Sequence, residues 1–215
     1  MDIVNPAIEK YMRGLAARHD EAVLLEMERE GEERHFPIIG RLVGVTIEVL
    51  ARAIGARRVF ELGSGFGYSG YWFSRAVGPE GELHLTDGDP DNERKAMDYL
   101  GRAGLDGPVR FRVGDAVASL QATEGDFDVV YCDIDKHGYP EAWQAARQRI
   151  RPGGLYICDN VLWSGRVVEG SAEDDDRPEW TEAIRRHNRM IADDEGYLST
   201  IVPTRDGVMV ALRVG

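Results

Sequence analysis

The sequence predicts a single α/β domain built on a seven-stranded, mostly parallel sheet with helices on both faces. From Glu61 onward, short apolar runs alternate with segments of helical periodicity, which is typical of a doubly wound sheet. The last two apolar runs are joined by Asp206 and Gly207, a strong signal for an antiparallel hairpin. A length of 215 residues suits one such domain and is too short for two.

The expected elements follow in order along the chain. Apolar residues at helical spacing predict helix from about residue 6 to 33, with Asp20 as an N-cap within this stretch. Residues 1–45 are interpreted as an N-terminal helical cap on a core of residues 46–215. Strands are predicted at 58–62, 82–87, 109–113, 127–132, 154–159, 197–202 and 208–213. Helices are predicted near 68–78, 90–103, 138–150 and 178–192.

A glycine-rich turn after the first strand indicates a nucleotide-type site. Glycines stand at 63, 65 and 67, and glycine lets a backbone turn tightly and approach a ligand closely. Read alone, they could simply turn the chain. The second strand ends in Asp87, however, where a carboxylate can accept hydrogen bonds from ribose hydroxyls. Glu61 would repel a pyrophosphate but attract a sulfonium and an amino group, so S-adenosylmethionine is favoured over a dinucleotide.

Hard oxygen ligands follow two later strands of the predicted sheet. Asp133 and Asp135 come directly after one strand, and Asp159 and Asn160 end the next. Because the carboxyl ends of parallel strands meet at one edge of a sheet, these side chains are expected to share a crevice. Carboxylate and amide oxygens suit Mg²⁺ or Ca²⁺, and no Cys and His cluster selects zinc. The alternative is that Asp159 and Asn160 merely begin a loop.

Composition limits the functions to consider. A formal net charge of −12 argues against a large non-specific nucleic-acid surface, and the acidic run at 173–176 is interpreted as a solvated loop. The sequence has no run of eighteen apolar residues, and its first residues lack the basic region and apolar core of a signal peptide. A cytoplasmic protein without a membrane span is therefore expected. Cys132 and Cys158 are expected to be buried free thiols on neighbouring strands.

Several spaced motifs occur in a fixed order: Phe60-Glu61-Leu62-Gly63 with Gly67-Tyr68-Ser69, Phe127 to Lys136 with Tyr139, Gly153-Gly154 to Gly165, and Pro203 with Asp206-Gly207. In this order they resemble the cation-dependent class I O-methyltransferases, the family of catechol and caffeoyl-CoA O-methyltransferases. The resemblance implies a Rossmann-like class I methyltransferase fold with a C-terminal antiparallel hairpin. It also implies S-adenosylmethionine as methyl donor, a divalent cation (Mg²⁺, with Ca²⁺ or Mn²⁺ as alternatives) and a homodimer.

The resemblance assigns roles to individual residues. Asp133, Asp159 and Asn160 correspond to metal ligands, and Lys136 to a lysine proposed as general base; its alternative is simple pairing with Asp133 or Asp135. Substrate contacts are expected at Trp163 and Ser164, although plant members have asparagine at the position of Ser164, and Trp163 could instead pack beneath the metal loop. Cofactor contacts are expected at Ile39, Glu61, Gly63, Ser64, Gly65, Tyr68, Ser69, Asp87, Gly88, Asp115, Ala116, Asp133 and Asp135.

The predicted activity is methyl transfer to a hydroxyl of a catechol-like small molecule, a hydroxylated aromatic vicinal diol. For such a reaction, the pKa of Lys136 is expected to be lowered by a nearby cation and by burial. The alternative activity is methylation of a hydroxylated wobble uridine in tRNA, because the segment from Met27 to Gly40 resembles bacterial members that do so. That activity would need a basic face, for which the candidates are Arg13, Arg18, Arg34, Arg41, Arg166, Arg185 and Arg186. A cofactor-binding module without catalysis is disfavoured, since the metal set and the lysine are all present.

Overall fold

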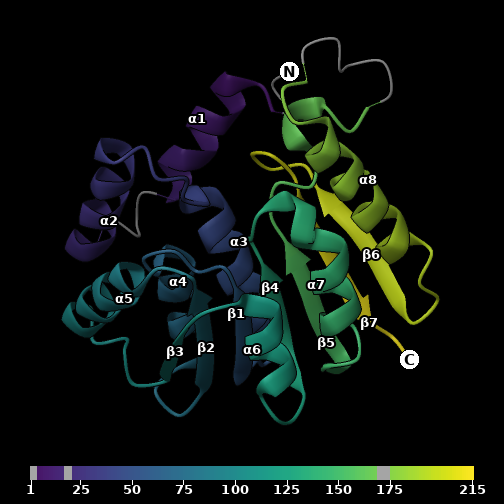
Figure 1. The fold of residues 1–215 in the computed structure, drawn as a ribbon. Helices are drawn as coiled ribbons and strands as arrows, with labels where there is room; N and C mark the ends of the chain where they lie inside the picture. The colour runs from purple at the N-terminus through teal and green to yellow at the C-terminus, as the bar shows by residue number, and fades with distance from the viewer. Residues whose placement is uncertain (1–3, 17–20, 169–174) are drawn as a thin grey trace.

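A seven-stranded sheet forms the centre of the part of the chain that the computed structural model describes, residues 4–16, 21–168 and 175–215 (Figure 1). The strand order is β3-β2-β1-β4-β5-β7-β6, and β7 alone runs antiparallel to its neighbours. The predicted fold class is thereby confirmed, whereas the predicted N-cap Asp20 lies outside the described residues. The strands are β1 (Arg58–Leu62), β2 (Glu82–Asp87), β3 (Val109–Val113), β4 (Phe127–Cys132), β5 (Ile150–Cys158), β6 (Tyr197–Val202) and β7 (Val208–Arg213).

Helices cover both faces of this sheet. Neighbouring strand residues point to opposite faces, so Val59 packs into one core and Phe60 into the other. The first core is closed by α2 (Ala22–Glu33), α3 (Gly40–Ala53), α4 (Tyr68–Val77) and α5 (Pro90–Arg102). The second core is closed by α6 (Ala116–Ala122), α7 (Tyr139–Ala146) and α8 (Pro178–Ala192).

The predicted boundaries agree with the structure for six of the seven strands, and the fifth strand is longer than expected. It begins at Ile150 rather than at residue 154, and α7 correspondingly ends at Ala146 rather than at 150. The cause is the neighbouring strand: Ile150 is paired with Phe127, whose N–H donates to the carbonyl of Arg149 at 2.7 Å. Pairing with β4 thus overrides the local helical periodicity of this segment. Two helices of the structure, α3 and α6, were not predicted.

The N-terminal segment is helical, as predicted, and consists of α1 (Pro6–Leu15) followed by α2. Leu24 and Met27 of α2 are fully buried against the first core, whereas α1 contains no buried residue. Among the described residues, no helix is long and apolar enough to cross a membrane. Cys132 and Cys158 face each other across the β4–β5 ladder as buried free thiols, as the sequence predicts.

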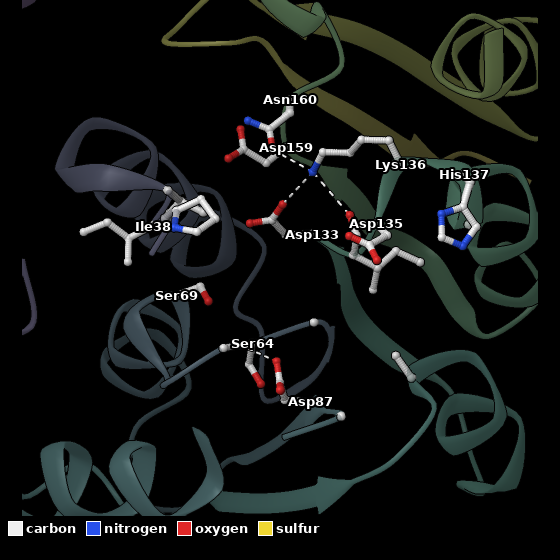
Figure 2. Close-up of a pocket in the computed structure, with 18 of the residues that line it drawn as sticks. Ile38, Ser64, Ser69, Asp87, Asp133, Asp135, Lys136, His137, Asp159 and Asn160 are labelled. Atoms are coloured by element: carbon white, nitrogen blue, oxygen red, sulfur yellow. Dashed lines mark hydrogen bonds and ion pairs between the residues drawn. The ribbon is translucent and has the colours of Figure 1, made fainter. Parts of the chain in front are cut away.

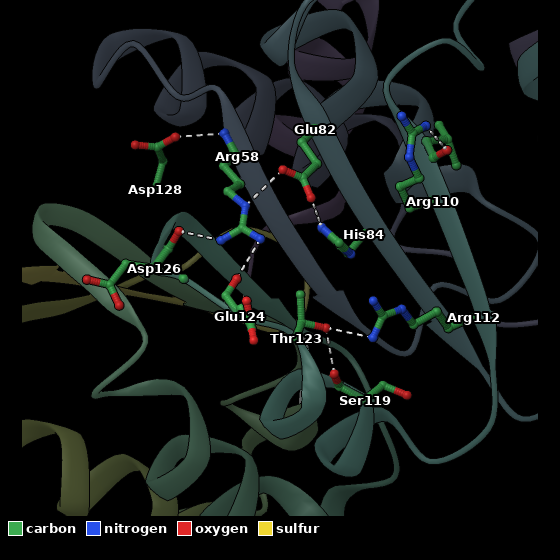
Figure 3. Close-up of polar contacts among 12 residues, drawn as sticks. Arg58, Glu82, His84, Arg110, Arg112, Ser119, Thr123, Glu124, Asp126 and Asp128 are labelled. Carbon is green, nitrogen blue, oxygen red and sulfur yellow. Dashed lines mark hydrogen bonds and ion pairs between the residues drawn. The ribbon is translucent and has the colours of Figure 1, made fainter.

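A polar network ties the amino ends of the strands together (Figure 3). The guanidinium of Arg58 donates through Nε to Glu82 at 2.9 Å and through its other two nitrogens to the carbonyls of Asp126 and Glu124. Asp128 accepts from the backbone N–H groups of Arg57 and Arg58, each at 2.7 Å. Backbone donation from Arg57 and an ion pair with Arg151 outweigh burial and hold the pKa of Asp128 below its usual value. At this end of the sheet, Arg58 and Asp128 are therefore held by several partners each.

Candidate active site

A pocket of about 900 Å³ opens at the opposite edge, where the parallel strands end (Figure 2). The turns after β1, β2 and β3 line one side, and the ends of β4 and β5 line the other. The segment 36–39 before α3 and the hairpin residue Arg205 complete the wall. The sequence therefore predicted the location of the crevice correctly from the strand ends alone.

The turn after β1 depends on the close approach of two backbones. Gly63 adopts φ +81°, and a Cβ there would lie 2.6 Å from the carbonyl oxygen of Asp133 at the end of β4. Gly65 adopts φ +50°, and a Cβ there would lie 2.8 Å from the ring of Phe36. Only glycine meets both demands, so the turn brings β1 against β4 and seats the N-terminal segment on the pocket.

Asp87 lies at the end of β2 and organises the same turn. Its carboxylate accepts from Gly65 N–H at 3.1 Å, Asp89 N–H at 2.8 Å and Asn92 Nδ2 at 2.9 Å. Because a carboxylate offers about four acceptor positions, room is left for a further donor from a ligand. Asp87 faces the pocket and is therefore both a support of the glycine turn and a candidate for contact with a ribose.

Glu61 sits behind this turn, fully buried, and accepts a hydrogen bond from the Ser69 hydroxyl. Its second oxygen, Oε2, has no partner among the described residues. Burial raises the pKa of Glu61 to about 8, offset in part by Ser69 and reinforced by Asp133 and Asp87. Unlike Ser69, Glu61 does not line the pocket. In this structure Glu61 contacts Ser69, and its predicted contact with the cofactor stays a prediction.

The predicted metal ligands come together with the predicted base at the ends of β4 and β5 (Figure 2). The Lys136 ammonium donates to Asp133 Oδ1 at 3.1 Å, to Asn160 Oδ1 at 2.8 Å and to the carbonyl of Ile134 at 3.2 Å. Asp159 is buried beside them, and its Oδ1 has no partner in the described chain. Burial, followed by the nearby charge of Asp133, raises the pKa of Asp159 to about 7.

This donor set fits a hard divalent cation. It offers an unpartnered buried carboxylate oxygen of Asp159, the carboxylate of Asp133 and an amide oxygen of Asn160, all of which suit Mg²⁺. No group of three or more His, Cys, Asp and Glu side chains in the described residues is arranged to hold a metal, and the set here has only two carboxylates. The remaining ligands of a bound cation would have to come from water or substrate.

The protonation of Lys136 differs from the expectation. Burial acts to lower the pKa of its ammonium, but the charge of Asp133 and its neighbours outweighs burial, and the net pKa lies above the usual value. The carboxylates that the fold places beside the amine thus act against the lowering by burial. The lowering was expected from a nearby cation as well as from burial, and with a cation it stays a prediction. The alternative prediction, pairing with Asp133, is observed at 3.1 Å.

Of the two predicted substrate residues, only Trp163 lines the pocket. Ser164 is exposed, and its backbone N–H donates to Asp206, so the structure does not bring its side chain to the site. Asn160, Trp163 and Ser164 all have positive φ, between 48° and 55°. Non-glycine residues in this conformation store strain, and such strain is concentrated at functional loops.

All the predicted cofactor residues except Glu61 line the pocket. The lining includes Ile39, Gly63, Ser64, Gly65, Tyr68, Ser69, Asp87, Gly88, Asp115, Ala116, Asp133 and Asp135. Asp115 also caps α6 by accepting from Ala118 N–H at 2.7 Å. Sequence reasoning missed Phe36, Arg177, Trp180 and Arg205, which line the pocket from distant segments. No local motif marks Arg177 and Trp180, which tertiary structure brings to the pocket. Phe36 and Arg205 lie in segments used for the family resemblance, but nothing in those segments marks them as pocket residues.

The arginines proposed for a tRNA-binding face are mostly paired with acids. Arg18 lies outside the described residues, and Arg186 is exposed on α8. Each of the others that the structure describes forms an ion pair with a carboxylate, namely Arg13, Arg34, Arg41, Arg166 and Arg185. These positive charges are thus largely neutralised by neighbouring acids.

The sheet order, the antiparallel β7 and the pocket at the strand ends define a Rossmann-like enzyme of the class I methyltransferase type. The family model described as O-methyltransferase matches residues 16–214, so the chain belongs to the O-methyltransferase family. The catechol O-methyltransferase of Niastella koreensis is 31% identical over 96% of each chain. A probable caffeoyl-CoA O-methyltransferase of Dictyostelium discoideum is 27% identical, covering 89% of this chain and 84% of that protein.

Solved structures of O-methyltransferases share the whole fold. The O-methyltransferase TomG from Streptomyces achromogenes, crystallised in complex with S-adenosylmethionine, superposes with a TM-score of 0.84 at 26% identity. The match covers 97% of this chain and 96% of that one. The similarity therefore includes the N-terminal helices as well as the sheet.

Proposed function

We propose that this O-methyltransferase transfers the methyl group of S-adenosylmethionine to one hydroxyl of an aromatic vicinal diol, in a reaction that depends on a divalent cation. One observation carries the proposal: Asp133, Lys136, Asp159 and Asn160 share one pocket with the glycine turn and Asp87. The similarity to catechol and caffeoyl-CoA O-methyltransferases supports the choice of acceptor.

The residues divide into a donor side and an acceptor side. On the donor side, Asp87 would accept hydrogen bonds from the ribose while the backbone at Gly63 and Gly65 lets the ligand approach. On the acceptor side, Asp133, Asp159 and Asn160 would hold the cation, which when bound supplies a Lewis acid that favours ionisation of a hydroxyl. Holding two reactants in one pocket accounts for much of the expected acceleration.

Lys136 is the group placed to take the hydroxyl proton as the oxygen–methyl bond forms and the sulfur–methyl bond breaks. It must be neutral to do so, and the carboxylate of Asp133 favours its ammonium form. The pKa of Lys136 would be lowered by a cation held by Asp133 and Asp159, because the positive charge of the cation offsets the carboxylates that raise this pKa. Base catalysis by Lys136 and cation binding are therefore expected to depend on each other.

The test is methyl transfer from labelled S-adenosylmethionine to a catechol, measured with Mg²⁺ and with excess EDTA. Turnover that requires the cation and is restored by adding Mg²⁺ supports the proposal. Full turnover in EDTA contradicts the cation dependence, and transfer to hydroxylated tRNA without transfer to any diol contradicts the choice of acceptor.

A further inference from the structure

The acceptor side of the pocket carries an aromatic wall with an arginine at its rim. Trp163, after β5, and Trp180, in the first turn of α8, have ring centroids 5.8 Å apart and are tilted by 38°. The guanidinium carbon of Arg177 lies 4.5 Å from the Trp180 ring centroid. All three residues line the same pocket as Lys136. A flat ring held near Lys136 would therefore have indole rings and a guanidinium beside it.

Two neighbouring arginines on this side have different electrostatic roles. Arg166 stacks on Trp163 and pairs with Asp175 and Asp176 at 3.7 and 3.5 Å. Arg177 forms no ion pair with any residue in the described ranges: its backbone N–H donates to Asp175, its carbonyl accepts from the N–H groups of Trp180 and Thr181, and its guanidinium lies over the Trp180 ring. Among the described residues, Asp175 and Asp176 are paired with Arg166, and Arg177 lines the pocket with its charge unpaired.

The pocket lining carries further charges of both signs. Arg205 donates to the carbonyl of Ile38 at 2.5 Å, and its positive charge acts on Asp159 and Asp206 rather than beside Arg177. His137 lies 6.2 Å from the Trp180 ring, between ring centroids. The acids of the lining on the acceptor side are Glu141 from α7 and the carboxylates at the ends of β4 and β5, Asp133, Asp135 and Asp159. Arg177 therefore supplies a positive charge at the aromatic wall of a pocket whose lining is otherwise rich in carboxylates.

We propose that the acceptor diol carries an anionic substituent, a carboxylate on the ring or on a short side chain, and that Arg177 binds it. This inference rests on the proposed function, because it places the diol at Asp133, Asp159 and Asn160. A guanidinium binds a carboxylate through paired, charge-assisted hydrogen bonds, and the adjoining indole can stack on the acceptor ring. The substrate class is thus dihydroxylated aromatic acids rather than neutral or cationic catechols.

The test compares three acceptors that share one ring and one diol: 3,4-dihydroxybenzoate, its neutral amide and the cationic 3,4-dihydroxybenzylamine. The unmodified protein is expected to prefer the acid to the amide by about tenfold in kcat/KM, with the amine the poorest, since a charge-assisted contact contributes at least this much. Arg177→Gln should remove the preference, mainly through KM, and Arg177→Lys should retain part of it. Arg186→Gln is the matched control, because Arg186 is exposed on α8, does not line the pocket and carries the same charge.

Two results would overturn the inference: equal kcat/KM for acid and amide in the unmodified protein, or an equal loss for both in Arg177→Gln. Absence of turnover with all three acceptors would instead contradict the proposed function. In that event, calorimetric binding of the acid and the amide in the presence of S-adenosylhomocysteine decides the role of Arg177. Tighter binding of the acid that is lost in Arg177→Gln supports it; equal binding of acid and amide, or no binding of either, refutes it.

Discussion

Acidic side chains at the two ends of the sheet differ in their hydrogen-bond partners and in the direction of their pKa shifts. At the amino ends, both oxygens of Asp128 accept hydrogen bonds, from two backbone N–H groups and from Arg151, and its pKa lies below the usual value. At the carboxyl ends, Glu61 and Asp159 each keep one buried oxygen without a partner in the described chain, and their pKa values rise to about 8 and about 7. One end uses charge to hold strands together. The other leaves a carboxyl oxygen of each acid without a partner and favours the protonated form, which stabilises the protein less but suits a ligand.

The largest effect is expected for Lys136→Met, which keeps side-chain length and removes the amine. A general base contributes typically about 10²–10⁴-fold, so kcat should fall within that range while KM for the diol changes little. Lys95→Met is the control, because Lys95 pairs with Glu30 away from the pocket. An unchanged kcat across the pH range, with cation dependence intact, would show that Lys136 only pairs with Asp133.

The next effect is on donor affinity. Asp87→Ala should weaken binding of S-adenosylmethionine by about 1–3 kcal/mol, measured by calorimetry, because a carboxylate that would accept hydrogen bonds from the ribose is removed. Asp87 also supports the turn through Gly65 and Asn92, so Asn92→Ala separates the two roles. Asn92→Ala should cost clearly less. Equal losses in the two variants would mean that Asp87 acts by holding the turn rather than by contacting the ligand.

A smaller effect concerns how stability depends on pH through Glu61. Its pKa is raised on folding, so the folded state binds the extra proton, and stability falls as pH rises from the unfolded pKa near 4.5 toward about 8. Glu61→Gln keeps an acceptor for Ser69 and removes the titration. Between pH 5.5 and 7.5, the free energy of unfolding in urea should drop by on the order of 2 kcal/mol more in the unmodified protein than in Glu61→Gln. Parallel pH profiles would show that Glu61 is not held neutral by the fold.

Local patterns predicted the strands because each strand is an apolar run with a clear end, and the strand ends in turn located the pocket. Helix α3 escaped prediction even though Val43, Ile47 and Ala51 recur at helical spacing, since Gly40 and Gly44 weaken the helical signal. The aromatic wall of the pocket was not predicted from the sequence for another reason. Trp180 and Arg177 carry no motif, and only the packing of α8 against the second core brings them to the pocket.

The protonation of the site could not be predicted from residue types. The sequence placed Lys136 near a cation and a buried pocket, and both lower a pKa. The fold adds Asp133 and Asn160 within 3.1 Å of the amine, and the carboxylate reverses the direction. The burial of Glu61 behind Ser69 could not be predicted either. Alternation along a strand predicts which face of the sheet a side chain lies on, but not which residues cover that face.

The contrast between the two ends is tested most directly by Asp159→Asn and Asp128→Asn, each measured for turnover per folded molecule and for free energy of unfolding at pH 7. Asp159→Asn is expected to abolish cation-dependent methyl transfer while leaving stability unchanged or higher, because it removes a buried carboxyl group whose Oδ1 has no partner and whose ionisation burial disfavours. Asp128→Asn is expected to lower stability by about 1–3 kcal/mol and to leave kcat unchanged, because it weakens bonds to two backbone donors and Arg151. Full turnover in Asp159→Asn would contradict a catalytic role for the carboxyl ends of the strands. An equal loss of kcat in Asp128→Asn and Asp159→Asn would contradict a purely structural role for the amino ends.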